Sequence, residues 1–261
     1  MNLFVFDIET VPDVAGARRL HGLSQALDDA AVANALFARR RQQSGSDFLP
    51  LYLHRVVAIS AVLRSGDRFK VWSLGDEDCA EAELIARFFD GIDRFSPDLV
   101  SWNGGGFDLP VLHHRALLHG IAAPRYWESG DEDQSFRWNN YLSRFHQRHT
   151  DLMDVLAGYQ PRAGAPLDQL AALCGFPGKL GMSGAHVWDS YLAGRIADIR
   201  AYCETDVVNT YLLWLRYQLM RGRLDRTGYD AEIGRVRDTL EHTEGAHWKA
   251  FLLAWADAAA R

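Results

Sequence analysis

The stretch LFVFDIET, residues 3–10, places two carboxylates inside a run of large apolar residues. Its Leu, Val, Phe and Ile side chains are typical of a buried β-strand. Residues i and i+2 of a strand project from the same face, so Asp7 and Glu9 point to one place. Two neighbouring carboxylates repel each other, and burial adds a desolvation cost to each unless a cation neutralises them. The stretch therefore predicts a buried strand over residues 2–8 that presents an acidic pair suited to a cation.

Carboxylate oxygens are ligands that hard divalent cations such as Mg²⁺ and Mn²⁺ prefer. The spacing Asp-x-Glu is weak evidence by itself, because a chain of this length holds about one copy by chance. Asp230 and Glu232 form a second copy, which we expect on an exposed helix. The apolar strand around Asp7 and Glu9 is what distinguishes the first copy.

The composition is that of an ordinary globular protein, with 261 residues, 48% hydrophobic and 24% charged residues, and a net charge of −6. This charge gives no global sign of a polyanion partner, although a local basic surface would matter more. No apolar run approaches the roughly 18 residues that cross a bilayer, and no signal peptide is visible, so we expect no membrane association. The three cysteines are scattered and lack C-x-x-C spacing, which favours a reducing, cytoplasmic location without disulfides.

Hydrophobic periodicity divides the rest of the chain into alternating strands and helices. We expect strands over 55–64, 69–74 and 98–102, helices over 80–95, 109–119 and 195–220, and a short strand leading into a helix over 149–156. Opening strands followed by alternating units predict one α/β domain over residues 1–261, with a mixed five-stranded sheet flanked by helices. Residues 13–50 would be an insertion between the first two strands, residues 128–140 a surface loop, and residues 229–261 a C-terminal helical extension.

Two further acids are candidates for the same site. Asp108 follows a glycine turn at the end of a predicted strand, where α/β sheets commonly bind ligands. An Asp before Leu-Pro is equally a natural helix N-cap. Asp206 lies in the middle of a helix, where Asp is a poor helix former, and Tyr202 is on the same helix face four residues earlier. An exposed Tyr–Asp pair is the alternative, but the apolar neighbours of Asp206 indicate burial.

These residues lie in three motifs that occur in a characteristic order: FDIET (6–10), WNGGGFDLPVL (102–112) and YCETDVVNT (202–210). They resemble the three exonuclease motifs of the DEDD superfamily, and Tyr-x-x-x-Asp resembles its tyrosine subclass. The chain is most similar to a bacterial group of stand-alone exonucleases related to the proofreading domain of family B DNA polymerases. FLPLYLHRVVAIS (48–60) and GKLGMSGAHVW (178–188) also resemble that group, so the similarity covers most of the chain.

The resemblance implies a ribonuclease H-like fold and a metal-dependent 3′–5′ exonuclease. Such an enzyme hydrolyses the 3′ end of single-stranded nucleic acid, with DNA favoured, and releases nucleoside 5′-monophosphates. Two divalent ions, Mg²⁺ or Mn²⁺, would be held by the four carboxylates. Asp7 would bridge both ions, Glu9 and Asp206 would hold the water-activating ion, and Asp108 the second. Tyr202 would orient the attacking water.

Several alternatives share these residues. An RNA 3′-trimming exoribonuclease would have the same site, a non-catalytic nucleic-acid-binding module would have the same fold, and an endonuclease of the ribonuclease H type would share the metal ligands. His146 and Asp151 have the His-x-x-x-x-Asp spacing of the superfamily's histidine subclass. They lie in a polar loop and would leave Tyr202 and Asp206 without a role, so we favour the tyrosine. No polymerase-like segment is visible, so proofreading in cis is not expected.

Four residues are predicted to contact substrate, and two of them also have an ordinary structural interpretation. Thr10 follows the acidic pair, Asn103 precedes the glycines of the turn, Phe107 has a ring that can stack on a base, and Lys179 can contact a phosphate. Asn103 can equally be a plain turn residue and Lys179 a solvated loop residue. Asp151 is a weaker candidate behind the site.

Overall fold

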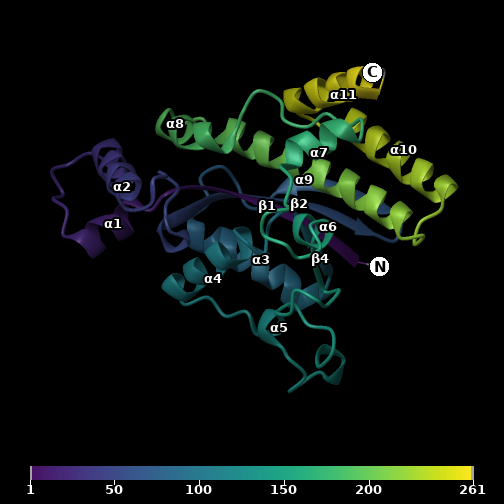
Figure 1. Ribbon diagram of the computed structural model, residues 1–261, viewed down its shortest axis with the longest axis horizontal. Helices are drawn as coiled ribbons and strands as arrows, with labels where there is room; N and C mark the ends of the chain where they lie inside the picture. Colours follow the sequence, from purple (N-terminus) through teal and green to yellow (C-terminus); the bar gives the residue numbers. More distant parts are fainter. Residues whose placement is uncertain (1, 260–261) are drawn as a thin grey trace.

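The computed structural model describes residues 2–259 and contains a five-stranded sheet between two helical layers (Figure 1). The strands are β1 (Asn2–Pro12), β2 (His54–Ser65), β3 (Arg68–Ser73), β4 (Asp98–Ser101) and β5 (His149–Asp151). Their order is β3-β2-β1-β4-β5. Strand β1 is antiparallel to β2 and parallel to β4, so the sheet is mixed. The predicted fold class is confirmed, and it is consistent with a ribonuclease H-like fold.

Helices cover both faces of the sheet. One layer contains α3 (Glu81–Phe95), α4 (Asp108–His119) and α5 (Pro124–Trp127), and the other contains α7 (Leu167–Leu173), α9 (Ile196–Met220), α10 (Arg226–His242) and α11 (Ala246–Ala259). Two short helices, α6 (Leu152–Leu156) and α8 (Val187–Leu192), connect the later elements. The long helix α9 is buried around most of its middle because it lies between the sheet and α7, α10 and α11. Within the described residues, no helix is both long and apolar enough to cross a membrane.

The alternation of β1 decides which layer faces the acidic pair. Phe4, Phe6 and Ile8 pack into the core beneath α3 and α4. Leu3 and Val5 point to the opposite face and pack into the core that contains α9. Since side chains alternate along a strand, Asp7 and Glu9 continue the row of Leu3 and Val5. The two carboxylates therefore face α9.

The segment between β1 and β2 contains two helices, α1 (Val14–His21) and α2 (Asp29–Ser44). Both lie beyond the end of β1, away from the N-terminus (Figure 1). Aspartates cap both helices, because Asp13 and Asp28 accept hydrogen bonds from backbone amides of the first turn. The segment thus has its own secondary structure and lies beside the end of β1 that carries Asp7 and Glu9.

Two local expectations hold only in part. Residues 128–140 are not simply a surface loop, because Phe136 is fully buried with Arg125 and Arg148 lying over its ring. The second Asp-x-Glu copy is not fully exposed either. Glu232 is largely buried and accepts hydrogen bonds from Arg64 at 2.7 Å and from the Tyr211 hydroxyl at 2.9 Å. For Glu232, a residue 168 positions away supplies the partner, which local composition does not reveal.

Candidate active site

A bulge lies beside the acidic pair. Glu9 pairs with Ala58 and Thr10 with Val56, so Val57 is an extra residue on β2 at this point. The backbone amide of Val56 donates a hydrogen bond to Glu81 Oε1 at 2.7 Å, which satisfies it locally. Bulges bend and twist a sheet and are common next to active sites. The strand geometry therefore changes directly after Glu9.

Asp108 is tied to the strand that carries the acidic pair. Its Oδ1 accepts a hydrogen bond from the backbone amide of Ile8 at 3.1 Å, and the residue is only 3% exposed. The N-cap of α4 is Phe107, which makes no capping hydrogen bond through its side chain within the described residues. The capping alternative for Asp108 is therefore wrong. The carboxyl group instead lies between the start of α4 and β1.

Helix α9 brings Tyr202 and Asp206 to the same place from the other side. Both are buried, as the apolar residues around them indicate, so the exposed-pair alternative is wrong. Asp206 Oδ1 is buried without a hydrogen-bond partner among residues 2–259. An unpaired buried carboxylate oxygen is costly, because it has lost water and gained nothing in return. A cation at this position would give the oxygen a ligand.

The electrostatics show that the four carboxylates share one environment. Burial raises the pKa of Asp7 well above its usual value, and the charges of Asp108, Glu9 and Asp206 raise it further. Burial and the charges of Asp206 and Asp108 likewise raise the pKa of Glu9. Burial raises the pKa of Asp108 to about 7. It raises the pKa of Asp206 to about 6, against the opposing effects of the Tyr202 hydroxyl and Lys179.

These residues fit a divalent cation. The donors are carboxylates, their mutual repulsion and burial are unfavourable while all are charged, and one oxygen is orphaned. Asp7, Glu9 and Cys203 each offer a donor atom, and those atoms lie within 4.8 Å of one another. A bound cation would remove the repulsion and give Asp206 Oδ1 a ligand. The structure therefore shows a possible acidic metal centre.

Cys203 is a neighbour of the site that sequence reasoning misses. Its Sγ donates to the backbone oxygen of Asp7 at 3.4 Å and lies 3.5 Å from Asp7 Oδ2. The thiol thus fixes β1 against α9 at the acidic pair. The available signal is its place directly after Tyr202 in YCETD, on a helix otherwise predicted to be buried.

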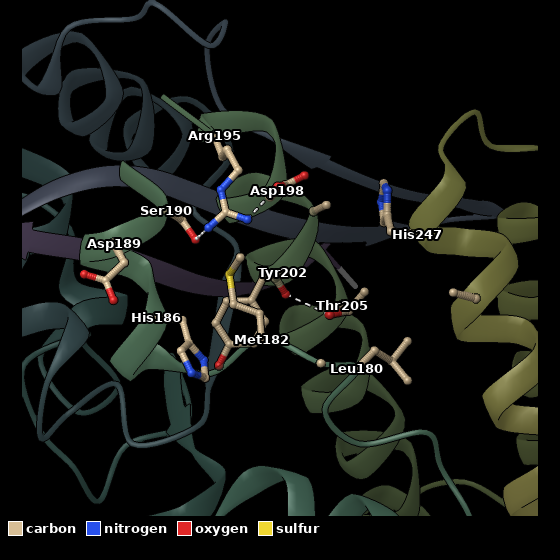
Figure 2. A pocket seen from close by; sticks show the side chains of 13 residues that line it. Leu180, Met182, His186, Asp189, Ser190, Arg195, Asp198, Tyr202, Thr205 and His247 are labelled. Atoms are coloured by element: carbon tan, nitrogen blue, oxygen red, sulfur yellow. Dashed lines mark hydrogen bonds and ion pairs between the residues drawn. The ribbon is translucent and has the colours of Figure 1, made fainter. Parts of the chain in front are cut away.

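Tyr202 lines a cavity beside helix α9. A cavity of about 540 Å³ lies between the 180–190 segment, α9 and α11. Figure 2 shows Tyr202 at its centre near Met182, with Arg195 bonded to Ser190 and paired with Asp198. The carboxylates of the site do not line this cavity within the described residues. Tyr202 therefore lines this cavity, and burial together with the charges of Asp206, Glu9 and Asp7 raises its pKa.

A second and larger cleft, of about 900 Å³, has Glu9 of the acidic pair in its lining. Its lining includes one metal-ligand candidate and all four predicted substrate contacts: Glu9, Thr10, Asn103, Phe107 and Lys179. Lys179 Nζ lies 5.9 Å from the centre of the Tyr202 ring, and its charge lowers the pKa of Glu9 and of Asp206. The cleft thus connects the carboxylates to residues that can hold a ligand.

The glycine turn is built by packing and by Asp151. A Cβ on Gly104 would lie 2.2 Å from Ser101 Oγ, so the turn needs glycine there. Asn103 has a left-handed backbone with φ of 62°, and its amide donates to Asp151 Oδ1 at 2.9 Å. Gly105 donates to the other oxygen of Asp151 at 2.9 Å. Asp151 therefore positions the turn from behind, and it also caps α6.

The structure does not bring His146 and Asp151 together at the carboxylates, as the histidine alternative requires. His146 Nδ1 accepts a hydrogen bond from the backbone amide of Asn140 at 3.0 Å within a loop. Asp151 is occupied by the turn amides. Among the described residues, the cleft lining includes neither of them. Trp102 is buried in the core and donates its indole N–H to the carbonyl of Ala165 at 3.1 Å.

Comparison with known proteins adds one match. A family model described as predicted 3′–5′ exonuclease related to the exonuclease domain of PolB matches residues 46–255. The matched range contains Asp108, Tyr202 and Asp206 and begins after β1, so Asp7 and Glu9 lie outside it. No curated protein matches the chain.

Proposed function

Because the chain belongs to the family of predicted 3′–5′ exonucleases related to the exonuclease domain of PolB, we propose that it shortens single-stranded nucleic acid from the 3′ end. Each step would hydrolyse a phosphodiester bond and release a nucleoside 5′-monophosphate, with DNA as the favoured substrate. The observation that carries this proposal is the buried carboxylate cluster, which reaches a ligand-sized cleft through Glu9.

Four carboxylates would hold the ions: Asp7, Glu9, Asp108 and Asp206. Two divalent cations, Mg²⁺ or Mn²⁺, would supply charge stabilisation to the attacking and leaving oxygens. The support is the raised pKa of these groups and the orphaned oxygen of Asp206. Their assignment as ligands is a proposal drawn from the motif resemblance and this environment.

Tyr202 would orient the attacking water, as in the tyrosine subclass of the DEDD superfamily. Burial and the charges of Asp206, Glu9 and Asp7 raise its pKa, so the hydroxyl keeps its proton at neutral pH. A neutral hydroxyl can donate one hydrogen bond and accept others, so it can fix a water without taking its proton. We therefore assign Tyr202 a positioning role in the site.

Around the cleft, Lys179 would attract a phosphate of the substrate, and Asn103 and Thr10 would offer polar groups. Phe107 would stack on a base. A cytoplasmic location stays a prediction.

The test is digestion of a 5′-labelled single-stranded DNA and a matched RNA, each with Mg²⁺, Mn²⁺ or EDTA. Wild type should give a metal-dependent ladder that shortens from the 3′ end, and Asp7→Ala should give none. The relative rates on DNA and RNA separate the favoured substrate from the RNA-trimming alternative. Tight binding with intact oligomers in every condition would contradict the proposal and favour a binding module.

A further inference from the structure

The segment between β1 and β2 reaches the cleft. Asn34 and Phe37 of α2 line it, and so do Asp47, Phe48 and Leu49, which follow that helix. In Figure 1 this segment lies at the end of the sheet toward which β1 runs from the N-terminus. The segment therefore forms part of the cleft wall and is more than a decoration of the fold.

Three rings gather on this wall. The centroid of Phe48 lies 5.2 Å from that of His54 and 5.8 Å from that of Phe107, and His54 and Phe107 are 5.1 Å apart. All three residues line the cleft, and Phe48 is 53% exposed. Every nucleic-acid base has a flat π-face, so exposed aromatic rings in a cleft suit base stacking.

The rings are held in place relative to the acidic pair. His54 Nδ1 lies 2.8 Å from Thr10 Oγ1, and its Nε2 lies 3.2 Å from the carbonyl oxygen of Leu49. A carbonyl only accepts, so Nε2 donates to Leu49 and the Thr10 hydroxyl donates to Nδ1. Arg40 Nε also donates to the carbonyl of Phe48 at 2.9 Å. His54 thus links the segment to β1 at the residue after Glu9.

The charge of the cleft also favours stacking over phosphate attraction. Its lining carries the acids Glu9, Asp47 and Asp189. Among the described residues of that lining, Lys179 is the one permanent cation. Few phosphate contacts give a weak electrostatic contribution to binding, so most of the affinity has to come from the rings.

We propose that Phe48, His54 and Phe107 form a stacking platform for the bases nearest the 3′ end, and that segment 13–50 is part of the substrate site. This inference rests on the proposed function, because it assigns the cleft to the same nucleic-acid end. Stacking reads no base edge, so the platform accepts any sequence and requires bases that are not paired in a duplex.

The test compares Phe48→Ala with Phe95→Ala, a matched control at the end of α3 that is 65% exposed and outside the cleft. Binding is measured in EDTA by anisotropy of a 5′-labelled DNA oligomer and by quenching of 2-aminopurine at its 3′ end. Phe48→Ala should weaken binding about 5- to 150-fold and remove the quenching, while Phe95→Ala should change neither. Phe48→Tyr should keep the quenching, and Phe48→Leu, which keeps the apolar bulk, should lose it.

An oligomer with abasic residues at its 3′ end separates stacking from a general structural effect. Wild type should bind it at least as weakly as Phe48→Ala binds the normal oligomer, and the loss caused by Phe48→Ala should be much smaller on the abasic oligomer than on the normal one. Equal losses of Phe48→Ala on normal and abasic ends would overturn the platform, as would unchanged binding. The binding and quenching measurements need no cleavage. If wild type shows the quenching but no turnover with metal, the proposed exonuclease activity is contradicted and the platform is not. Normal turnover with an unchanged KM in Phe48→Ala would contradict the platform alone.

Discussion

Asp108 Oδ1 accepts a hydrogen bond from the backbone amide of Ile8 at 3.1 Å, which fixes the start of α4 to the residue between Asp7 and Glu9. The pairing of β1 with β4 ends at Val5. Asp108 therefore supplies the acceptor for the Ile8 amide, where the neighbouring strand has ended. One side chain therefore accepts a hydrogen bond from β1 beyond the end of β4 and adds a carboxylate to the site.

This double role predicts different results for two substitutions of Asp108. Asp108→Asn keeps an oxygen acceptor for Ile8, so the free energy of unfolding should stay within about 1 kcal/mol of wild type. Asp108→Ala leaves the amide unpaired and should cost about 1–3 kcal/mol. Both should lose metal-dependent cleavage. Urea unfolding in EDTA and the oligomer assay check this, and equal stability of the two variants would contradict the role of the hydrogen bond.

The carboxylate cluster predicts that the metal-free protein becomes less stable as pH rises. The folded-state pKa of Asp108 is raised to about 7 and that of Asp206 to about 6, so the folded state holds more protons than the unfolded state from about pH 4 upward. The stabilisation that these bound protons give the folded state is fully present below about pH 4, and it is lost as the pH rises through the folded-state pKa values. In EDTA, the free energy of unfolding should therefore fall between pH 5 and pH 8.

Asp206→Asn is the control for this pH dependence. Without the Asp206 charge, the free energy of unfolding in EDTA should fall less between pH 5 and pH 8, by an amount on the order of 1–3 kcal/mol. Mn²⁺ or Mg²⁺ should restore the stability of wild type by about 2.7 kcal/mol at 100 times its dissociation constant. Identical pH profiles for wild type and Asp206→Asn in EDTA would contradict the shared environment of the carboxylates.

Tyr202→Phe tests the role of the hydroxyl while keeping the buried ring. The ring packs among apolar residues at the face of α9, so the melting temperature should change little. The rate of the chemical step in single-turnover experiments should fall about 10- to 100-fold, less than in Asp206→Asn, because the water is bound but poorly oriented. An unchanged rate would remove Tyr202 from the site and reopen the histidine alternative.

Lys179 should act through a phosphate of the substrate. Lys179→Ala should weaken binding to all sequences alike and reduce the slope of log affinity against log salt concentration by about 0.7, the value for one contact on a single strand. Lys249→Ala is a matched control, because Lys249 is exposed on α11 and lies outside the cleft. An unchanged salt slope in Lys179→Ala would contradict the contact.

The sequence predicts the acidic pair well because one rule decides its geometry. A two-residue period puts Asp7 and Glu9 on one face, and the buried run around them fixes the strand. The role of Asp108 could not be chosen from the sequence, since an acid before Leu-Pro fits a cap and a site equally. The contact from Cys203 to Asp7 joins residues 196 apart, so no local pattern reveals it.

The cleft wall is the least predictable part of the site. Phe48 and His54 are separated from Phe107 by more than 50 residues and meet only through the packing of the segment before β2 against the glycine turn. Phe136 is hidden in a similar way, because its acidic surroundings suggest exposure while its ring packs into the core beneath α3 and α4. Sequence periodicity reports the face that an element buries, and it says little about which loop covers which site.

The most direct measurement follows the product released from a single-stranded DNA oligomer labelled on its 3′-terminal nucleotide. With Mn²⁺, the first labelled product of wild type should be the 5′-mononucleotide, and EDTA or Asp206→Asn should abolish its release. Labelled fragments longer than one nucleotide as first products, or the same release from Asp206→Asn, would contradict a 3′–5′ exonuclease built on this carboxylate cluster.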